Sequence, residues 1–371
     1  MKFTLMQGEL QKALHVVASV VPSKSTLPIL ETVLIKAGSE GTLTLTATDL
    51  DISVRSQRSA TVEQEGCVAI SARRFFDVVR ELPDQEVSLI GDEGYLQLSC
   101  GRGRYRFVGA PVDDFPELPE LLGDKLVRVD PQKLERMIRR TLYAVSTDET
   151  RPELTGVFLE IDKGKLQMVA TNGHRLAQAA IHGSFKHEKE LLLPPKALNQ
   201  LLRLIPDIKE EVEIGGSKSY ARFVVGRTEL YSRLLEGPFP DYDRVIPKSS
   251  PLNAVIQRAD LMASLKRILV LSDSQTRQVK LTFGANLLKI LSEYQGAGEA
   301  AEEIPIEYDG DEVTIGYNGG YLLDMLKTIQ DNRVAMKFES SVSAGVFRPE
   351  KENSEEDMLC LVMPLRLPEE S

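Results

Sequence analysis

The sequence has no tryptophan, only four histidines and only three cysteines in 371 residues. Cys67, Cys100 and Cys360 lie far apart and are odd in number, which favours buried, reduced thiols over a disulfide framework or a zinc site. The histidines show no metal-ligand spacing. We therefore expect no metal and no cofactor.

Long apolar runs are also missing. None reaches the roughly 18 residues that a membrane-spanning helix needs. The opening MKFTLMQGELQKALHVV has a helical period and an early Glu9, where a secretory signal would be apolar throughout. The sequence predicts a cytoplasmic protein with no membrane partner.

Enzyme motifs are equally scarce. We find no G-x-x-x-x-G-K-[ST] loop, G-x-S-x-G elbow or H-E-x-x-H pair, and GGSKS at 215–219 lacks the spacing that cradles phosphates. We expect no catalytic residue, so the protein would not hydrolyse nucleotides itself.

The composition that is present is typical of a globular protein, with 42% hydrophobic and 27% charged residues. The length predicts two or three domains. A formal net charge of -10 argues against a protein that grips nucleic acid by its overall charge. Acidic residues concentrate at 210–211, at 299–303 and in the run ENSEEDM at 352–358.

One helical segment recurs three times, near 71, 194 and 318. The turns at 82–84, 205–207 and 329–331 align, with steps of 205 − 82 = 123 and 329 − 205 = 124 residues. Each copy places apolar residues at i, i+3, i+4 and i+7, which predicts one buried helix face used three times.

A second helix and the strands between the helices recur with the same period. The helix that starts after Asp130 has a candidate N-cap in this residue and a proline, Pro131, at its first position. Alternating β-branched stretches follow each first helix. We predict an α+β fold of three similar tandem domains, 1–124, 125–249 and 250–371. Each would have about eight short strands in antiparallel sheets and two helices on one side of them. Periodicity alone also allows three tandem α+β domains of another kind.

Five short strings make the repeat more specific: MKF at the start, TLPIL at 26–30, ATNGHRLA at 170–177, FPDYDRVIP at 239–247 and VMPLRL at 362–367. Together they resemble the bacterial DNA sliding clamp, the beta subunit of DNA polymerase III, over the whole chain. The resemblance implies the DNA clamp fold and a head-to-tail homodimer in which six similar domains form a ring lined by helices.

The ring geometry has independent support. Twelve helices about 10 Å wide, set side by side, place their axes on a ring roughly 38 Å across and leave roughly 28 Å clear, whereas six helices leave only about 9 Å. Two chains can therefore encircle a duplex and one chain cannot.

Cations opposite the apolar helix faces suggest how an acidic protein could surround DNA. A basic lining would attract phosphates weakly and without sequence preference, and the ring would hold DNA by topology. For a single helix, a solvated face is the commoner explanation, but the pattern recurs on several. Lys24 matches a loop position where the family contacts DNA, whereas Pro152 and Glu153 replace tyrosines that some relatives have. We expect these residues to face DNA: Lys24, Arg73, Arg80, Arg136, Arg139, Lys196, Arg203 and Lys266.

The resemblance also implies a hydrophobic groove for short peptides of polymerases, the clamp loader and repair proteins. Leu365 replaces a common methionine, and residues 368–371 extend the chain, so the rim of the groove can differ from that of relatives. For His174 a structural role is the simpler interpretation, and Arg175 and Arg366 would orient the peptide. The predicted groove comprises Leu154, Thr171, Gly173, His174, Arg175, Leu176, Pro240, Arg244, Val245, Val362, Met363, Pro364, Leu365 and Arg366.

The predicted subunit contact pairs basic residues of the first domain with acidic residues of the third. Its members are Arg74, Arg102, Arg104, Val270, Leu271, Glu299, Glu302 and Glu303. Ion pairs of this kind would set the orientation of the two subunits more than they would increase the affinity between them.

The functional hypothesis is a processivity factor in DNA replication. It would encircle duplex DNA, slide freely and tether the replicative polymerase, and an ATP-dependent loader would have to open it. The alternative is a repeat scaffold that binds protein partners without closing on DNA, and oligomeric state separates the two.

Overall fold

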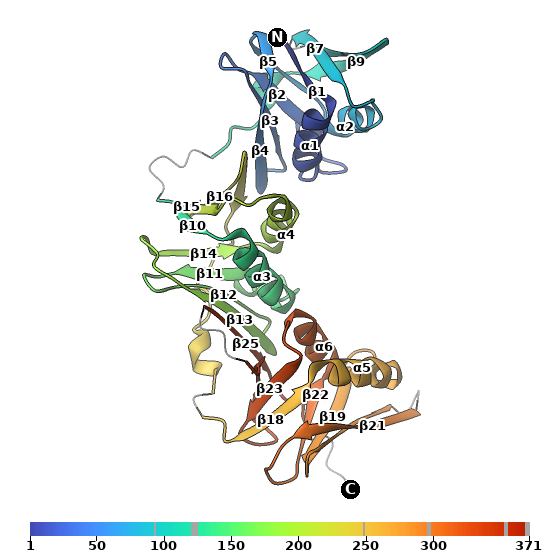
Figure 1. The fold of residues 1–371 in the computed structure, drawn as a ribbon, viewed down its shortest axis with the longest axis vertical. Coiled ribbons are helices and arrows are strands. Elements are labelled where there is room, and N and C mark those ends of the chain that lie inside the picture. The colour runs from blue at the N-terminus through green and yellow to red at the C-terminus, as the bar shows by residue number, and fades with distance from the viewer. Residues whose placement is uncertain (93, 120–124, 248, 295–297, 352–354, 368–371) are drawn as a thin grey trace. The chain divides into compact units, whose positions relative to one another are not determined.

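The computed structural model describes residues 1–371 except 93, 120–124, 248, 295–297, 352–354 and 368–371. The chain forms two compact units. The first unit consists of Met1–Glu135 and Lys196–Leu234, and the second of Arg136–Pro195 and Leu235–Ser371. We describe each unit by itself (Figure 1).

Antiparallel strands dominate the first unit, where the described residues form a 13-stranded sheet in the order β10-β15-β16-β17-β4-β3-β2-β6-β9-β8-β7-β1-β5. Alternating apolar residues place one face of most strands in the core; β8, for example, buries Leu96, Leu98 and Cys100. The strands are β1 (Lys2–Met6), β2 (Thr32–Ala37), β3 (Thr42–Thr48), β4 (Ile52–Ser59), β5 (Thr61–Gln64), β6 (Gly66–Ser71), β7 (Glu86–Asp92), β8 (Tyr95–Cys100), β9 (Gly103–Ala110), β10 (Val127–Val129), β15 (Val212–Gly216), β16 (Tyr220–Val225) and β17 (Thr228–Arg233).

The helices of the first unit are α1 (Gln7–Ala18), α2 (Ala72–Arg80) and α4 (Pro195–Leu204), the last from Lys196 onward. α1 packs against α2 and against β3 and β4, and it buries Leu10, Leu14 and Val17 (Figure 1).

The described part of the second unit forms a 12-stranded sheet in the order β14-β11-β12-β13-β25-β24-β23-β18-β21-β20-β19-β22. Its helices are α3 (Pro131–Thr141, from Arg136 onward), α5 (Arg258–Ile268) and α6 (Gly319–Thr328). The strands are β11 (Val157–Ile161), β12 (Lys165–Thr171), β13 (Arg175–His182), β14 (Lys189–Leu193), β18 (Leu252–Gln257), β19 (Gln278–Gly284), β20 (Leu287–Tyr294), β21 (Gly298–Glu307), β22 (Val313–Asn318), β23 (Arg333–Phe338), β24 (Gly345–Pro349) and β25 (Glu356–Val362).

The predicted fold class is confirmed: the described residues contain six α-helices and antiparallel sheets arranged in three repeats. The predicted cap of α3 is confirmed as well, because Asp130 Oδ1 accepts a hydrogen bond of 2.8 Å from the Lys133 N–H. Three short 3₁₀ helices directly continue an α-helix: Leu142–Ala144 follows α3, Ile205–Asp207 follows α4 and Leu269–Leu271 follows α5. Four others stand apart from the α-helices: Pro28–Glu31, Val112–Asp114, Pro152–Leu154 and Tyr242–Val245.

The domain boundaries remain predictions, and residue 124 lies outside the described residues. All three cysteines are free thiols, and Cys100 and Cys360 are buried as expected, whereas Cys67 is only partly buried.

Two strand pairs join one repeat to the next. In the first unit, β17 pairs with β4, from Thr228 opposite Ser56 to Ser232 opposite Ile52. In the second unit, β25 pairs with β13 in the same way, from Val362 opposite Arg175 to Glu356 opposite Ile181. The sheet of one repeat therefore continues into that of the next. We call the β4/β17 pair the first junction and the β13/β25 pair the second junction.

Candidate functional site

A buried apolar cluster lies at the second junction. Leu176 of β13 stands directly opposite Leu361 of β25, and Leu361 in turn stands opposite Val346 of β24. Adjacent strands thus bring three apolar side chains together from distant parts of the sequence. The cluster consists of Val169, Leu176, Ala344, Val346, Leu359 and Leu361, with Phe239, Tyr242 and Ile246 packed against it.

The segment 239–246 is held on the sheet by aromatic and polar contacts. The ring of Phe239 stacks on Phe158 of β11, with centroids 5.1 Å apart and planes at 6°. The Tyr242 hydroxyl donates to Glu160 at 3.2 Å and accepts from the Gln167 amide. Burial and the nearby Glu160 raise the pKa of this phenol. The neighbouring Val245 is 51% exposed.

Residues 362–366 lie next to the apolar cluster of the second junction. The Met363 N–H donates to the His174 carbonyl at 2.9 Å, and Leu365 forms a β-bridge with Gly316. Met363 is 43% exposed. The structure therefore brings parts of 171–176, 240–245 and 362–366, which the sequence analysis assigned to one groove, into one region of the second unit.

His174 lies in a tight turn. Its N–H donates to Asn172 Oδ1 at 3.0 Å, and Gly173 before it has φ of 87°, a conformation that favours glycine. Leu154 is only 7% exposed, in the 3₁₀ helix Pro152–Leu154.

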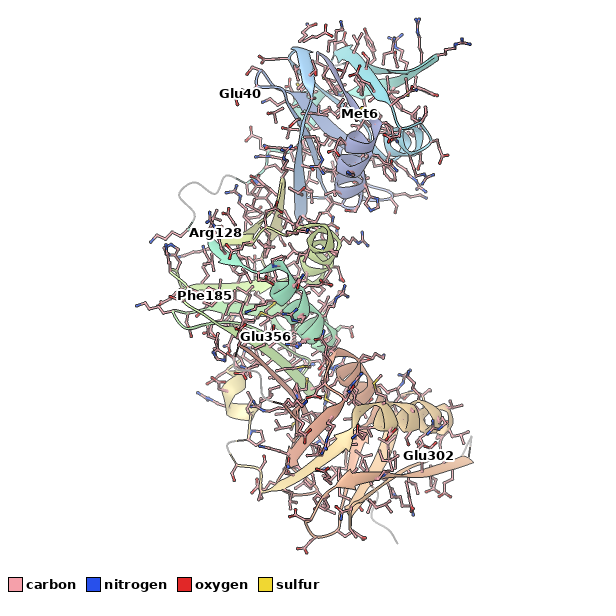
Figure 2. All side chains as sticks on the ribbon, in the orientation of Figure 1. Met6, Glu40, Arg128, Phe185, Glu302 and Glu356 are labelled. Carbon is pink, nitrogen blue, oxygen red and sulfur yellow. The ribbon has the colours of Figure 1, made fainter. Side chains whose placement is uncertain are left out.

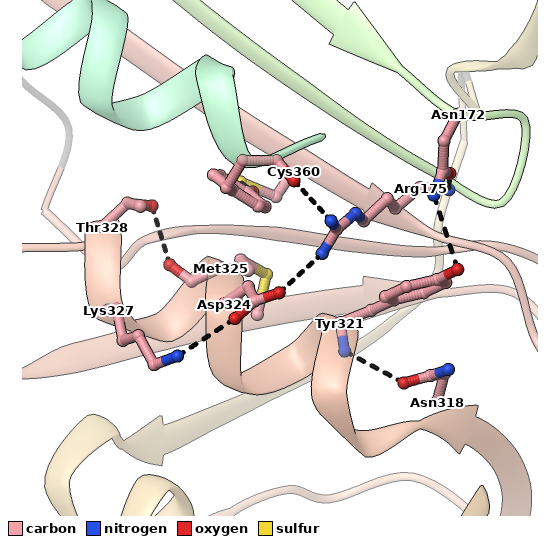
Figure 3. A network of polar contacts seen from close by, with 10 residues as sticks. Asn172, Arg175, Asn318, Tyr321, Asp324, Met325, Lys327, Thr328 and Cys360 are labelled. Atoms are coloured by element: carbon pink, nitrogen blue, oxygen red, sulfur yellow. Dashed lines mark hydrogen bonds and ion pairs between the residues drawn. The ribbon is translucent and has the colours of Figure 1, made fainter. Parts of the chain in front are cut away.

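Arg175 has a different environment from the one we expected (Figure 3). Its side chain is 12% exposed and pairs with Asp324 of α6 at 3.0 Å. It also donates to the Tyr143 carbonyl, and its guanidinium lies 4.4 Å from the centroid of the Tyr321 ring and 5.2 Å from that of Tyr143. The charge that we expected to orient a peptide is therefore already engaged by the protein.

Asp324 and the two tyrosines are functional neighbours that sequence reasoning missed. Burial alone would raise the pKa of the Asp324 carboxyl, but Arg175 and Lys327 hold it below its ordinary value. Cys360 lies next to this network, 3.1 Å from the Tyr143 hydroxyl, and burial raises the pKa of its thiol to about 12. A thiol that stays protonated at neutral pH is a poor nucleophile.

The predicted DNA-facing cations fall into two groups. Most are exposed, and some of these carry ion pairs: Lys196 pairs with Asp49, and Arg80 pairs with Glu81 at 3.1 Å. The exposed members are Lys24, Arg73, Arg80, Lys196 and Arg203 in the first unit, and Arg139 and Lys266 in the second.

Arg136 differs from these residues. Together with Arg140, it binds the carboxylate of Glu356 on β25, whose side chain is only 8% exposed (Figure 2). Burial would raise the pKa of Glu356, but the two arginines hold it below its ordinary value. The charge of Arg136 is thus paired within the protein, and its role toward DNA stays a prediction.

Two sheet edges carry half of the residues of the predicted subunit contact: Arg104 on β9, and Glu299, Glu302 and Glu303 on β21. Among the described residues, β9 from Gly103 to Val108 pairs only with β8, and β21 from Gly298 to Pro305 pairs only with β20. The edge of β9 has Arg104 and an 85% exposed Val108, which the sequence analysis missed. Near the edge of β21, Val270 is 77% exposed.

The acidic residues of β21 are not equivalent. Glu299 and Glu303 are exposed, whereas Glu302 pairs with Arg267 of its own chain at 2.5 Å (Figure 2). Arg267 also holds the pKa of the Glu302 carboxyl below its ordinary value. Glu299 and Glu303 are therefore the acids with more freedom to meet a partner.

No helix in the described part of the chain has the length and apolar character to cross a membrane. Over the same residues, no group of three or more His, Cys, Asp or Glu side chains is arranged to hold a metal ion.

Comparison with known proteins finds one family along nearly the whole chain. Models of the N-terminal, central and C-terminal domains of the DNA polymerase III beta subunit match residues 1–119, 128–241 and 243–366. Proteins named beta sliding clamp from Pseudomonas putida and Synechococcus elongatus are each 33% identical, with 99% of this chain and 100% of each relative covered.

Solved structures agree. The DNA polymerase III subunit beta of Pseudomonas aeruginosa has a TM-score of 0.94 at 32% identity, with 99% of this chain and 100% of that chain covered. A sliding clamp from the same organism bound to griselimycin has a TM-score of 0.92 at 32% identity and the same coverage.

Proposed function

Since this chain belongs to the DNA polymerase III beta subunit family of bacterial sliding clamps, we propose that two copies close into a ring around duplex DNA. The ring acts as a processivity factor: it slides on DNA, has no catalytic step of its own and tethers the replicative polymerase. The observation that carries the proposal is that most of β9 and most of β21 pair on one side only, whereas the equivalent strands at the two junctions pair on both sides.

The topology indicates how a second copy is added. In the sheet orders, β4, β13 and β21 occupy equivalent places in the three repeats, and so do β9, β17 and β25. The junctions within the chain pair β4 with β17 and β13 with β25. Only β21 and β9 then lack the corresponding partner among the described strands. Pairing β21 of one copy with β9 of another completes the series, and two such contacts close six repeats into a ring.

Charge supports this pairing over others. Arg102 and Arg104 lie at one edge, and Glu299 and Glu303 at the other. Exposed Val108 and Val270 supply apolar surface at the same two edges. Opposite charges favour head-to-tail contact and disfavour like edges meeting. Lone exposed strand edges with apolar side chains are also prone to pair with another chain.

DNA lies inside the ring, next to the helices. The exposed cations of α2, α3, α4 and α5, with Lys24, attract phosphates without reading bases. The formal net charge of -10 keeps non-specific affinity low, so the duplex is retained by enclosure.

Partner proteins bind at the second junction through a short peptide. Its apolar side chains rest on Val245 and Met363, above the buried cluster. Arg244 and Arg366 are exposed there and are better placed than Arg175 to meet polar groups of the peptide. Because the protein has no nucleotide motif of its own, a separate ATP-dependent loader opens the ring.

Retention on DNA tests the proposal. The protein is loaded onto singly nicked circular DNA with a clamp loader and ATP, and bound protein is measured before and after the circle is linearised. We expect retention on the circle and rapid loss from the linear ends. Equal retention on both forms would refute topological binding. A protein that binds partner peptides but never associates with the circle would instead be a non-enclosing scaffold.

A further inference from the structure

A cavity of about 900 Å³ lies at the first junction. It is formed by α1, the end of α4, β4 and the turn between β16 and β17, all of them in the first unit. Four permanent cations line it: Lys12, Arg58, Arg203 and Arg227. Two acids, Glu9 and Glu210, and one histidine, His15, also line it, so the cations exceed the acids by 4 − 2 = 2.

The deepest cation is Arg58. Its side chain is 14% exposed and lies 3.7 Å from Glu9. Burial and, to a smaller extent, Arg227 lower the pKa of its guanidinium, while Glu9 raises it. Two arginines that disfavour each other's charge in a partly buried hollow would both be stabilised by an anion between them.

The second junction has the equivalent position one repeat later. At the first junction Thr228 stands opposite Ser56, and at the second junction Met358 stands opposite Ala179. Ala179 follows Ser56 by 179 − 56 = 123 residues, which is one repeat step. Gly226 lies two residues before Thr228, and Glu356 lies two residues before Met358. Gly226 therefore has the place at the first junction that Glu356 has at the second.

Helix α1 corresponds to α3 by a similar step. Leu10 and Leu134 are both buried and 134 − 10 = 124 residues apart, so Lys12 corresponds to Arg136. At the second junction, Arg136 and Arg140 hold the carboxylate of Glu356. At the first junction, the strand contributes no acid at this place, because Gly226 forms a turn with φ of 58° and is followed by another cation, Arg227.

We propose that the first junction is a binding site for a phosphate group supplied from outside the chain, in the place that the protein's own Glu356 carboxylate occupies at the second junction. The phosphate contacts Arg203 of α4 and Arg227 of the turn, because both side chains line the cavity and are exposed. Arginine suits this role because its planar guanidinium binds two oxygens of a phosphate at once. The phosphate belongs either to the backbone of enclosed DNA or to a free phosphate compound.

The test uses the full-length protein and inorganic pyrophosphate as the free probe, with binding measured by isothermal titration calorimetry. The double variant Arg203→Gln with Arg227→Gln should bind pyrophosphate about a hundredfold more weakly, because each of the two lost charge-assisted contacts contributes about tenfold. Both side chains are exposed, so the variant should keep its thermal midpoint. Lys36→Gln removes an exposed cation of the same unit outside this cavity and should leave the affinity unchanged.

A second measurement separates the two sources of phosphate. The affinity for a short linear duplex is measured by fluorescence anisotropy at several salt concentrations. The single variant Arg227→Gln is used here, because Arg227 is not among the cations expected to face DNA. If DNA supplies the phosphate, the slope of log affinity against log salt falls by about 1 in this variant. If a free phosphate compound is the ligand, the slope stays as in the wild type while pyrophosphate binding is weakened.

The inference is overturned if pyrophosphate does not bind, if it binds the double variant as well as the wild type, or if Lys36→Gln weakens it equally. None of these results depends on ring closure. Retention on circular DNA tests ring closure separately.

Discussion

Arg175 lies in the predicted peptide groove, yet its charge is already engaged within the protein. Its guanidinium is shared by Asp324, the Tyr143 carbonyl and two aromatic rings. The string ATNGHRLA assigned this residue to the predicted groove, but its partner Asp324 lies 149 residues further on. No local pattern reports a contact of that separation, so the sequence could not show that the charge is engaged.

Arg175→Lys should lower the free energy of unfolding by about 2 kcal/mol, because lysine cannot keep the planar stacking and two directed hydrogen bonds at once. Urea unfolding at neutral pH measures the change. Arg366→Lys, at an exposed position, should stay within about 0.5 kcal/mol of the wild type. Equal stability of all three proteins would contradict the structural role of Arg175.

Glu356 predicts a pH dependence. Its folded-state pKa lies below its ordinary value, so its pairs with Arg136 and Arg140 stabilise the protein fully above about pH 4.3. That stability is lost as the pH falls through the lower, folded-state pKa. Glu356→Gln should lower the melting temperature at pH 7 and flatten its fall below pH 5, as calorimetry can show. Glu339→Gln, on the surface, should change neither. An unaltered pH profile in Glu356→Gln would rule out this linkage.

At the level of elements, the sequence predicted most of what the structure contains. Apolar spacing located the six helices because each has a buried face that repeats every 3.6 residues, as Phe75 and Val79 show in α2. Spacing does not locate the helix ends as well, since a 3₁₀ turn such as Leu142–Ala144 directly continues α3 and differs from it in its hydrogen-bond pattern. Strand pairing across the junctions could not be derived from periodicity, because it depends on contacts between strands more than 170 residues apart, such as Arg55 and Glu229.

The N-terminus of α3 offers a direct test at this level. Asp130→Ala removes the side chain that accepts from the Lys133 N–H and should cost about 1 kcal/mol of stability. Asp130→Ser keeps a capping oxygen and should recover most of the loss. Thermal unfolding of the three proteins would decide, and an alanine variant as stable as the serine variant would show that the cap contributes nothing.

At the scale of the whole molecule, the internal repeat predicted more of the architecture than any single motif did. It fixed the number of helices available to line a ring, and the structure then showed that β9 from Gly103 to Val108 and β21 from Gly298 to Pro305 pair on one side only among the described residues. The sequence placed Arg102, Arg104, Glu299 and Glu303 in the subunit contact by resemblance alone. It gave no signal for Val108, because one exposed valine in a strand is ordinary until its edge is known to be open.

Charge reversal tests the head-to-tail pairing without DNA. A chain with Arg102→Glu and Arg104→Glu, or a chain with Glu299→Arg and Glu303→Arg, should dimerise at least about tenfold more weakly, since like charges then meet at both contacts. Mixing the two variants should restore the dimer, because each contact again joins opposite charges. Sedimentation velocity measures all three samples. A mixture no more dimeric than its components would exclude this pairing of edges.

Because the edges of β9 and β21 differ, a contact between them leaves one edge of each kind at the ends of any open chain of molecules. Such an assembly can always accept another copy, and only curvature stops it. Two copies exhaust their edges if each repeat turns the chain by one sixth of a circle. A substitution that changes this angle at either junction, far from the subunit contact, would therefore leave the edges intact and yet convert a closed ring into a growing filament.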